Sequence, residues 1–290
     1  MRALPPLQHA APRASVGRVS RPMTTGGSEP RGALLGPATD PPGLASGAAR
    51  RAGSCVPGGV AALATAVLDL VFPALCPVCE TRLGAGRRDP LCGGCWDAIA
   101  RIAPPYCDAC GMPGPPCCAR CAAEPRVWDY ARSAARYEGP LREALHAFKF
   151  GARRALARPL GDLLVEQCAA ALPQGVACVV PVPLAWERER ERGFNQARLL
   201  AERVATRLGV PLRPRWVARV RTTQPQSDLS AEARWANVLG AFRASAAAAG
   251  RHVLVVDDVF TTGATLAACT RALRDAGAAR IGVLTVARVV

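Results

Sequence analysis

Runs of consecutive apolar residues recur along the second half of the chain. Two are continuous, at Val176–Val180 and Val253–Val256, and a less regular one lies at Ile281–Ala287. Continuous runs are typical of strands buried on both faces, because helices cover both sides of a parallel sheet. Ala131–Tyr137 predicts one more strand. The pattern therefore predicts an α/β fold, a parallel sheet flanked by helices.

Segments of helical periodicity separate these runs. Gly139–Pro140 predicts a helix start, and Gly151 closes that helix after Phe150. Asn195 and Ser230 each precede a helical segment and are suited to cap its first turn. Gly277 is suited to the position after the last helix. The predicted helices are about 139–150, 159–172, 197–208, the segment after Ser230, and 266–273.

Candidate chemistry follows the second apolar run directly. Val253–Val256 leads into Asp257 and Asp258, then into Thr261–Thr265 and a helix. The first N–H groups of a helix lack partners within it, and they face an anion along the positive end of the helix dipole. Gly263 allows close backbone approach, and the carboxylates suit sugar hydroxyls or a hard cation. This order of elements predicts a phosphate site.

The stretch resembles the phosphoribosyl-diphosphate (PRPP) motif of type I phosphoribosyltransferases. The resemblance implies that Asp257 and Asp258 hold the ribose hydroxyls. It also implies that the small loop cradles the 5′-phosphate, through Thr261, Thr262, Gly263, Ala264 and Thr265. A Walker-type loop is excluded because no Gly-Lys-Ser/Thr follows, and a dinucleotide fingerprint is excluded because no G-x-G-x-x-G opens the helix. The alternative is that the two carboxylates only solvate a strand end.

A second loop is expected beside Asp257. The run Val176–Val180 ends in Pro181–Leu184, and ligands of parallel sheets bind outside the carboxyl ends of the strands. Val182 and Pro183 are therefore candidates to bind pyrophosphate through the backbone. Arg192 is a further candidate, because arginine binds phosphate oxygens in a bidentate way. The alternating charges that precede Arg192 are equally consistent with a solvated face.

Cysteines dominate the segment before the predicted sheet. Nine of the 13 lie between Cys76 and Cys121, mostly as C-x-x-C pairs. Two such pairs supply the four thiolates of a closed, structural zinc site, whereas a redox C-x-x-C would sit in a βαβ context. The predicted ligands are Cys76, Cys79, Cys92 and Cys95 for one zinc, and Cys107, Cys110, Cys118 and Cys121 for a second. Cys117 is an alternative to Cys118.

The four remaining cysteines and the net charge have simpler explanations than a binding site. Cys55, Cys168, Cys178 and Cys269 stand in apolar settings and are expected to fill the core. The net charge is +15, but 36 of the 37 basic residues are Arg, which indicates a coding bias rather than a nucleic-acid surface. The basic balance still suits an anionic ligand.

Composition divides the chain into three expected parts. Residues 1–53 are rich in Pro, Gly, Ala and Arg and predict a disordered leader. Residues 54–125 are expected to hold a double zinc ribbon after a short helix at 60–72, and 126–290 the sheet. No membrane span is predicted, because the run Val60–Leu75 is interrupted by Asp69 and Pro73. The cysteine pattern suggests a reducing cytoplasm.

These features together resemble the ComF family, a double zinc ribbon followed by a type I phosphoribosyltransferase-like domain, over about residues 60–290. Besides the eight cysteines and Asp257–Thr265, the resemblance rests on short motifs in the family's order: Tyr137–Gly139, Lys149–Phe150, Pro181–Pro183, Arg192–Gln196, Gln226–Leu229, Arg234–Asn237 and Gly240–Phe242. It implies a cytoplasmic protein associated with natural competence or the use of external DNA.

Two functions are consistent with this resemblance. The first is a protein that binds PRPP or another sugar phosphate with Mg²⁺, with Asp257, Asp258 and Arg192 as candidate catalytic residues. Whether the protein also catalyses a phosphoribosyl transfer stays open, because no acceptor pocket is recognisable in the sequence. The second is a non-catalytic adaptor that binds single-stranded DNA or a nucleotide. Its ribbons would dock a competence helicase or another DNA-uptake protein.

Overall fold

A computed structural model describes residues 74–84, 90–124, 126–221 and 230–290 of the chain. These residues lie within one compact unit. The predicted leader, the predicted helix at 60–72 and Cys55 lie outside the described residues. Within the described residues, no helix has the length and apolar character needed to cross a bilayer. The domain limits at 54–125 and 126–290 remain predictions.

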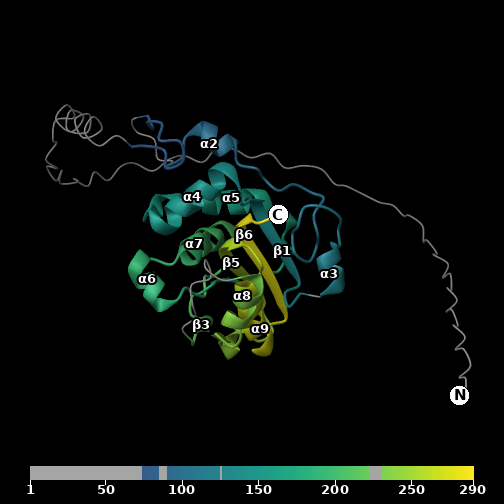
Figure 1. The fold of residues 1–290 in the computed structure, drawn as a ribbon. Helices are drawn as coiled ribbons and strands as arrows, with labels where there is room; N and C mark the ends of the chain where they lie inside the picture. Colours follow the sequence, from purple (N-terminus) through teal and green to yellow (C-terminus); the bar gives the residue numbers. More distant parts are fainter. Residues whose placement is uncertain (1–73, 85–89, 125, 222–229) are drawn as a thin grey trace, which may run out of the picture. The chain divides into compact units, whose positions relative to one another are not determined.

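A four-stranded parallel sheet forms the centre of the fold (Figure 1). In spatial order its strands are β1 (Tyr130–Arg136), β6 (Arg280–Arg288), β5 (His252–Phe260) and β2 (Cys178–Pro181). β6 is buried except at Arg280, and β5 is buried at its four-residue apolar run, Val253–Val256, as the apolar runs predict. The predicted α/β class with a parallel sheet is confirmed.

Helices cover both faces of this sheet, and each face has its own apolar core. One face packs against α4 (Gly139–Phe150), α5 (Ala157–Cys168) and α7 (Gln196–Leu208). The other face packs against α9 (Ala264–Asp275), α8 (Ala231–Val238) and an antiparallel hairpin of β3 (Val217–Arg219) and β4 (Phe242–Ala244). The shorter helices are α2 (Gly93–Asp97), α3 (Ala119–Ala123) and α6 (Trp186–Arg192).

Most predicted boundaries agree with the structure, and the caps are as expected. The Asn195 side chain accepts a hydrogen bond from the N–H of Arg198 at the start of α7. Ser230 does the same for Ala233 in α8. One boundary differs, because β5 continues past the valines through both aspartates to Phe260. Its edge toward β6 stays hydrogen-bonded as far as the pair Phe260–Arg288.

The cysteine-rich segment packs directly on the sheet domain. Residues 100–102 pair with the free edge of β1, where the N–H of Ile102 donates to Ala134 O. Cys76 and Cys95 belong to the same apolar core as α4 and α5. Three of the remaining cysteines are buried, as predicted for core fillers: Cys168, Cys178 and Cys269.

Candidate anion site and metal centres

A cavity of about 670 Å³ lies at the carboxyl end of β5 and β2. β2 ends at Pro181 opposite Val256, whereas β5 runs on to Phe260 with that edge uncovered. The space beside the uncovered edge is the cavity. It brings together nine of the ten residues predicted for the phosphate site, namely Val182, Pro183, Arg192, Asp257, Asp258, Thr261, Gly263, Ala264 and Thr265.

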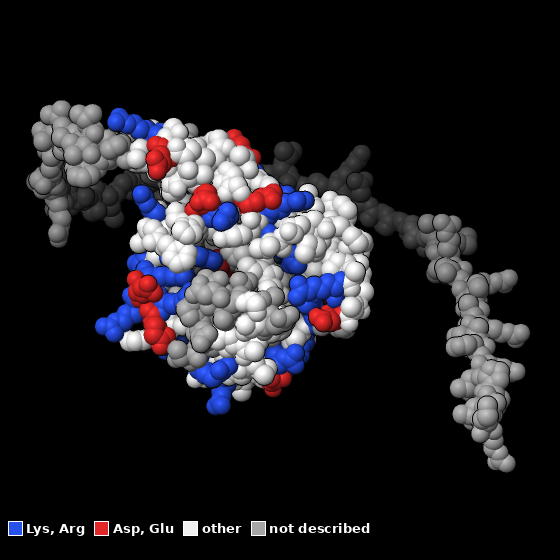
Figure 2. Space-filling model, in the orientation of Figure 1, with Lys and Arg blue, Asp and Glu red and all other residues white. Residues whose placement is uncertain are grey.

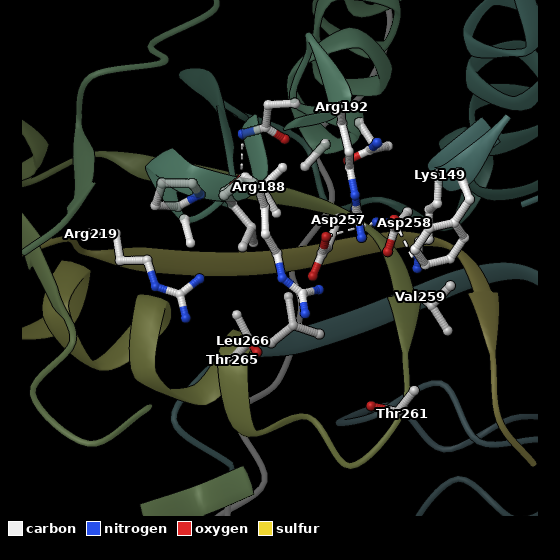
Figure 3. Close-up of a pocket in the computed structure, with 18 of the residues that line it drawn as sticks. Lys149, Arg188, Arg192, Arg219, Asp257, Asp258, Val259, Thr261, Thr265 and Leu266 are labelled. Carbon is white, nitrogen blue, oxygen red and sulfur yellow. Dashed lines mark hydrogen bonds and ion pairs between the residues drawn. The ribbon is translucent and has the colours of Figure 1, made fainter. Parts of the chain in front are cut away.

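The two carboxylates lie at the centre of this cavity (Figure 3). The N–H of Asp258 donates to Asp257 Oδ1 at 2.9 Å. Asp258 Oδ2 lies 3.0 Å from Lys149 Nζ of α4. Burial, reinforced by the negative charge of Asp258, raises the pKa of Asp257 to about 8. A cation bound beside Asp257 would favour its carboxylate form.

The loop after β5 forms a tight turn into α9. Gly263 has φ +83°, in the left-handed region that favours glycine, and directly precedes the helix. The first bond inside the helix runs from Ala267 N to Gly263 O. Thr262 is absent from the cavity wall, and its hydroxyl instead accepts from the N–H of Ala264 at 3.4 Å. The predicted loop-to-helix geometry is present.

The turn after β2 lies beside Asp257, as predicted. The N–H of Val182 donates to Val256 O at 3.0 Å, so the turn is tied to β5. On its other side, the buried amide of Asn195 donates to Val182 O at 3.1 Å. Asn195 thus joins the start of α7 to this turn, a role that its predicted capping function did not reveal.

The charged segment before Arg192 forms α6, and two of its arginines line the cavity. Arg188 and Arg192 are four residues apart and therefore share a helix face. Arg192 Nη1 donates to Gln196 Oε1 at 3.2 Å, and its guanidinium lies over Phe150. Burial, with the nearby Arg188 charge, lowers the pKa of Arg192. The segment is thus partly a solvated face and partly cavity wall.

Three cations of the cavity were missed by the site prediction. Lys149 comes from α4, Arg188 from α6 and Arg219 from β3. Burial lowers the pKa of Arg219, and Arg188 contributes to the same shift through its charge. The sequence signals were weak: Lys149 is the chain's lone lysine, Arg188 is one turn from Arg192, and nothing singles out Arg219. With Arg192, four basic side chains face two aspartates and Glu191.

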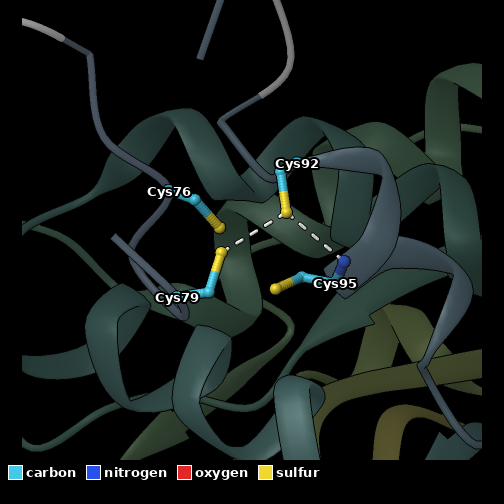
Figure 4. A group of neighbouring side chains, drawn as sticks. All are labelled: Cys76, Cys79, Cys92 and Cys95. Atoms are coloured by element: carbon cyan, nitrogen blue, oxygen red, sulfur yellow. Dashed lines mark hydrogen bonds between the residues drawn. The ribbon is translucent and has the colours of Figure 1, made fainter. Parts of the chain in front are cut away.

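The first cysteine cluster contains the four predicted ligands, Cys76, Cys79, Cys92 and Cys95. Figure 4 shows their sulfur atoms converging, with Cys79 Sγ and Cys92 Sγ 3.5 Å apart. Zn–S bonds of about 2.3 Å in a tetrahedron place sulfurs about 3.8 Å apart. The N–H of Cys95 points at Cys92 Sγ at 3.4 Å, as in a zinc knuckle. The donor set therefore fits one zinc ion.

The second cluster contains Cys107, Cys110, Cys118 and Cys121, all with sulfurs within 4.8 Å of one another. Cys117 is exposed and outside the group, which favours Cys118 as the ligand. Two arginines neutralise this cluster. Arg126 Nε lies 3.4 Å from Cys121 Sγ, and Arg288 Nη2 lies 3.7 Å from Cys110 Sγ.

Comparison with known proteins gives this arrangement a family. Residues 67–136 match the double zinc ribbon domain, and residues 195–289 match the phosphoribosyl transferase domain. The chain is 35% identical over 229 residues to the DNA utilization protein YhgH of Salmonella typhi, covering 76% of this chain and 99% of that protein. It is 33% identical to the competence protein F of Haemophilus influenzae, covering 69% and 91%. The chain belongs to the ComF family.

A more distant ComF relative is the competence protein ComFC of Bacillus subtilis. It is 29% identical over 200 residues, covering 66% of this chain and 80% of that protein. The family relation accounts for both halves of this ComF protein, the cysteine clusters and the sheet with its cavity. Its relatives are named for competence or DNA utilization.

The surface charge of this ComF protein is mixed. Figure 2 shows basic side chains spread over the face in view, with acidic side chains between them. On α6, for example, Glu187, Glu189 and Glu191 alternate with arginines. Where charges of opposite sign alternate, the local surface potential is weaker than over a patch of one sign. The cations that matter for a ligand are those that line the cavity.

Proposed function

We propose that this ComF protein binds PRPP or a related sugar phosphate, together with Mg²⁺, in the cavity at the carboxyl end of the sheet. It would act in the cytoplasm, in the uptake or use of external DNA. One observation carries the proposal: the Asp257–Asp258 pair, the start of α9 and the Val182–Pro183 turn line one cavity. Three separate parts of a sugar-phosphate site are thus supplied by three separate segments.

The ribose and its 5′-phosphate would lie along β5 and the following loop. Asp257 and Asp258 would accept hydrogen bonds from the two ribose hydroxyls. The 5′-phosphate would lie against Thr261 and Gly263–Thr265, where hydroxyl donors and the positive end of α9 favour an anion. The turn at Gly263 supports this placement, since its positive φ directs the chain into the helix.

The pyrophosphate would lie between the Val182–Pro183 turn and α6. Arg192 supplies a guanidinium fork, and Lys149 adds a positive charge beside Asp258. Magnesium would neutralise part of the diphosphate charge when bound, with oxygen ligands from the substrate and solvent. The four basic side chains that line the cavity support a ligand with several negative charges.

A transfer reaction at this site would break the bond between C1 of ribose and the pyrophosphate oxygen. The acceptor nucleophile would form the new bond to C1, and the electron pair of the broken bond would leave with pyrophosphate. Arg192 and Lys149 would stabilise the departing charge. Arg188 and Arg219 line the cavity from α6 and β3, and they favour an acceptor that carries a negative charge.

A second function is favoured by the cavity rim. Phe150 lines the cavity and is 62% exposed, and Trp186, the first residue of α6, is 68% exposed. Arg192 stacks on Phe150 and Arg190 on Trp186. Exposed aromatic rings beside arginines suit the stacking of bases from single-stranded DNA. In this alternative the protein is a non-catalytic adaptor. A nucleotide or DNA phosphate occupies the cavity, and the ribbons dock a competence helicase or another uptake protein.

Calorimetry on the zinc-loaded full chain separates the two functions. PRPP is titrated with and without Mg²⁺, and a single-stranded oligonucleotide is titrated at about 50 mM and about 200 mM salt. Sugar-phosphate binding predicts saturable, Mg²⁺-dependent binding of PRPP. If the protein is a non-catalytic adaptor, titration with PRPP should give no heat of binding. Its affinity for the oligonucleotide should then fall steeply as salt rises, because counterions are released on binding. No PRPP binding at any Mg²⁺ concentration would reject the first function.

A further inference from the structure

Phe260 supports the loop that follows β5. It is the last residue of that strand and is 3% exposed. A Cβ on Gly263 would lie 2.7 Å from Phe260 Cε2 and 3.3 Å from Trp128 Cη2. The Phe260 and Trp128 rings meet edge to face, with centroids 5.5 Å apart. The loop backbone therefore rests directly on two aromatic rings.

The groups around Phe260 reach into the second cysteine cluster. Trp128 Nε1 donates to Ala109 O at 2.7 Å. The Arg288 guanidinium lies 4.1 Å from the Phe260 ring centroid, and its Nη1 donates to Cys110 O at 2.6 Å. Both carbonyls belong to the knuckle Cys107–Cys110, which holds two of the four sulfurs. Two buried polar groups thus link the cluster to the rings under the loop.

The positions of these carbonyls depend on the knuckle being closed. Ligand cysteines fix their own backbone only while the metal holds the sulfurs together, so metal binding and local folding are coupled. If the knuckle opens, Trp128 and Arg288 lose acceptors at buried positions, and such losses are costly. The Trp128 and Phe260 rings under Gly263 are then no longer held in place through the carbonyl groups of Ala109 and Cys110.

The first cluster offers a natural comparison. Its buried members Cys76 and Cys95 share a core with α4 and α5 on the opposite face of the sheet. Trp128 and Phe260 belong to the core on the α9 face. Within the described residues, no backbone hydrogen bond joins 76–84 or 90–95 to the loop 261–265. The two clusters therefore differ in their connection to the loop.

We propose that the second cysteine cluster positions the phosphate loop, with Trp128, Phe260 and Arg288 as the positioning residues. Metal at this cluster and anion at the loop are then thermodynamically coupled, and each strengthens the binding of the other. Metal at the first cluster lacks this coupling. The part of the proposal that concerns a bound sugar phosphate rests on the proposed function, whereas the ordering of the loop does not.

Hydrogen–deuterium exchange on the zinc-loaded full chain tests the ordering. Trp128→Phe keeps an aromatic ring but removes the N–H that reaches Ala109. We expect exchange at 261–267 to rise at least about fivefold, with both zinc ions retained, because the loop loses one of its two supports. Trp96→Phe, beside the first cluster, is the matched control and should stay within about twofold of wild type. Equal exchange in both variants would overturn the proposal.

Arg288→Lys supplies a second variant should Trp128→Phe lose its fold. Lysine keeps the charge but not the fork that contacts both Cys110 O and Phe260. We expect the same local rise in exchange at 261–267. Unchanged exchange would count against the proposal even if the zinc content stayed normal.

Zinc release to a zinc-selective chelator tests the reciprocal effect on wild type. Saturating Mg²⁺–PRPP should slow release from the second cluster at least about threefold and leave the first unchanged. The variant Cys79→Ser disables only the first cluster. Comparison with wild type therefore shows which kinetic phase of zinc release belongs to which cluster. Equal protection of both clusters would refute the coupling. If PRPP fails to bind at all, the proposed function fails, while the exchange result still decides whether the cluster orders the loop.

Discussion

Asp257 is the carboxyl group of the site whose pKa its surroundings raise most. Burial and the adjacent Asp258 charge raise its pKa to about 8, far above its usual 3.8. The folded state therefore holds a proton between about pH 4 and pH 8 that the unfolded state has released, so stability falls as pH rises through this range. A cationic or hydroxyl-rich ligand needs the carboxylate, so binding is favoured as the proton leaves.

This protonation predicts a pH profile for binding. Affinity for Mg²⁺–PRPP should rise by close to tenfold per unit as pH increases from about 6 toward 8, and then level off. In Asp257→Asn the profile should flatten, and the fall in melting temperature between about pH 5 and pH 8.5 should shrink. Calorimetry and thermal denaturation across this range measure both. A wild-type profile independent of pH would contradict the assigned pKa.

Only some residues of the cavity could be predicted from the sequence. Asp257, Asp258 and the loop were predictable because they are contiguous and follow a buried strand. Lys149 and Arg219 come from elements far away in the chain, and only the packing of α4 and β3 brings them to the cavity. The second role of Asn195 was hidden for the same reason, since its bond to Val182 O spans 13 residues.

At the scale of elements, Asn195 links helix and turn, and this link has a measurable effect. Asn195→Ala should remove the cap of α7, at about 1 kcal/mol, and leave the Val182 carbonyl without its donor, at about 1–3 kcal/mol more. Urea denaturation gives the loss in the free energy of unfolding. PRPP affinity should fall as well, because the Val182–Pro183 turn loses its support.

Ser230→Ala is the matched control for this prediction. Ser230 caps α8 through one bond of 3.2 Å to Ala233 N, so its loss should cost only about 1 kcal/mol. The variant should bind PRPP nearly as wild type does. Equal losses of stability and affinity in the two variants would show that Asn195 acts only as a cap.

Element types were largely predictable, and element ends less so. Apolar runs marked β2, β5 and β6 because both faces of the sheet are covered, and helix caps marked α7 and α8. The length of β5 was missed, because polar residues at 257 and 258 suggested a loop, while pairing with β6 kept the strand intact. The helical state of α6 was also hidden by its even alternation of charge.

For the molecule as a whole, the two cysteine clusters predict its metal content. Purified under reducing conditions, the chain should carry about two zinc ions, because each cluster closes a tetrahedron. Cys118→Ser should lower the content to about one, whereas Cys117→Ser should leave it unchanged. Elemental analysis by mass spectrometry measures this. Loss of zinc in Cys117→Ser would reverse the ligand assignment, and a content near zero in wild type would reject the metal centres.

Spacing predicted the first cluster fully, because four thiolates around one ion need no long-range information, but for the second cluster it left Cys117 as an alternative to Cys118. Their packing against the sheet was not predictable from spacing. It depends on pairs such as Trp128 with Ala109 and Arg288 with Cys110, which lie up to 178 residues apart. The net charge of +15 predicted little of the surface, since acidic side chains lie among the basic ones.

The most direct test of the sugar-phosphate account is calorimetry of Mg²⁺–PRPP binding to the variant Asp257→Asn/Asp258→Asn at about pH 8.5. Each charged hydrogen bond contributes about 1.5–3 kcal/mol. The variant should therefore bind at least about 100-fold more weakly than wild type, at 1.4 kcal/mol per tenfold. Asp162→Asn, whose carboxylate pairs with Arg203 outside the cavity, should bind as wild type does. Unchanged affinity in the double variant, with the fold intact, would contradict the account.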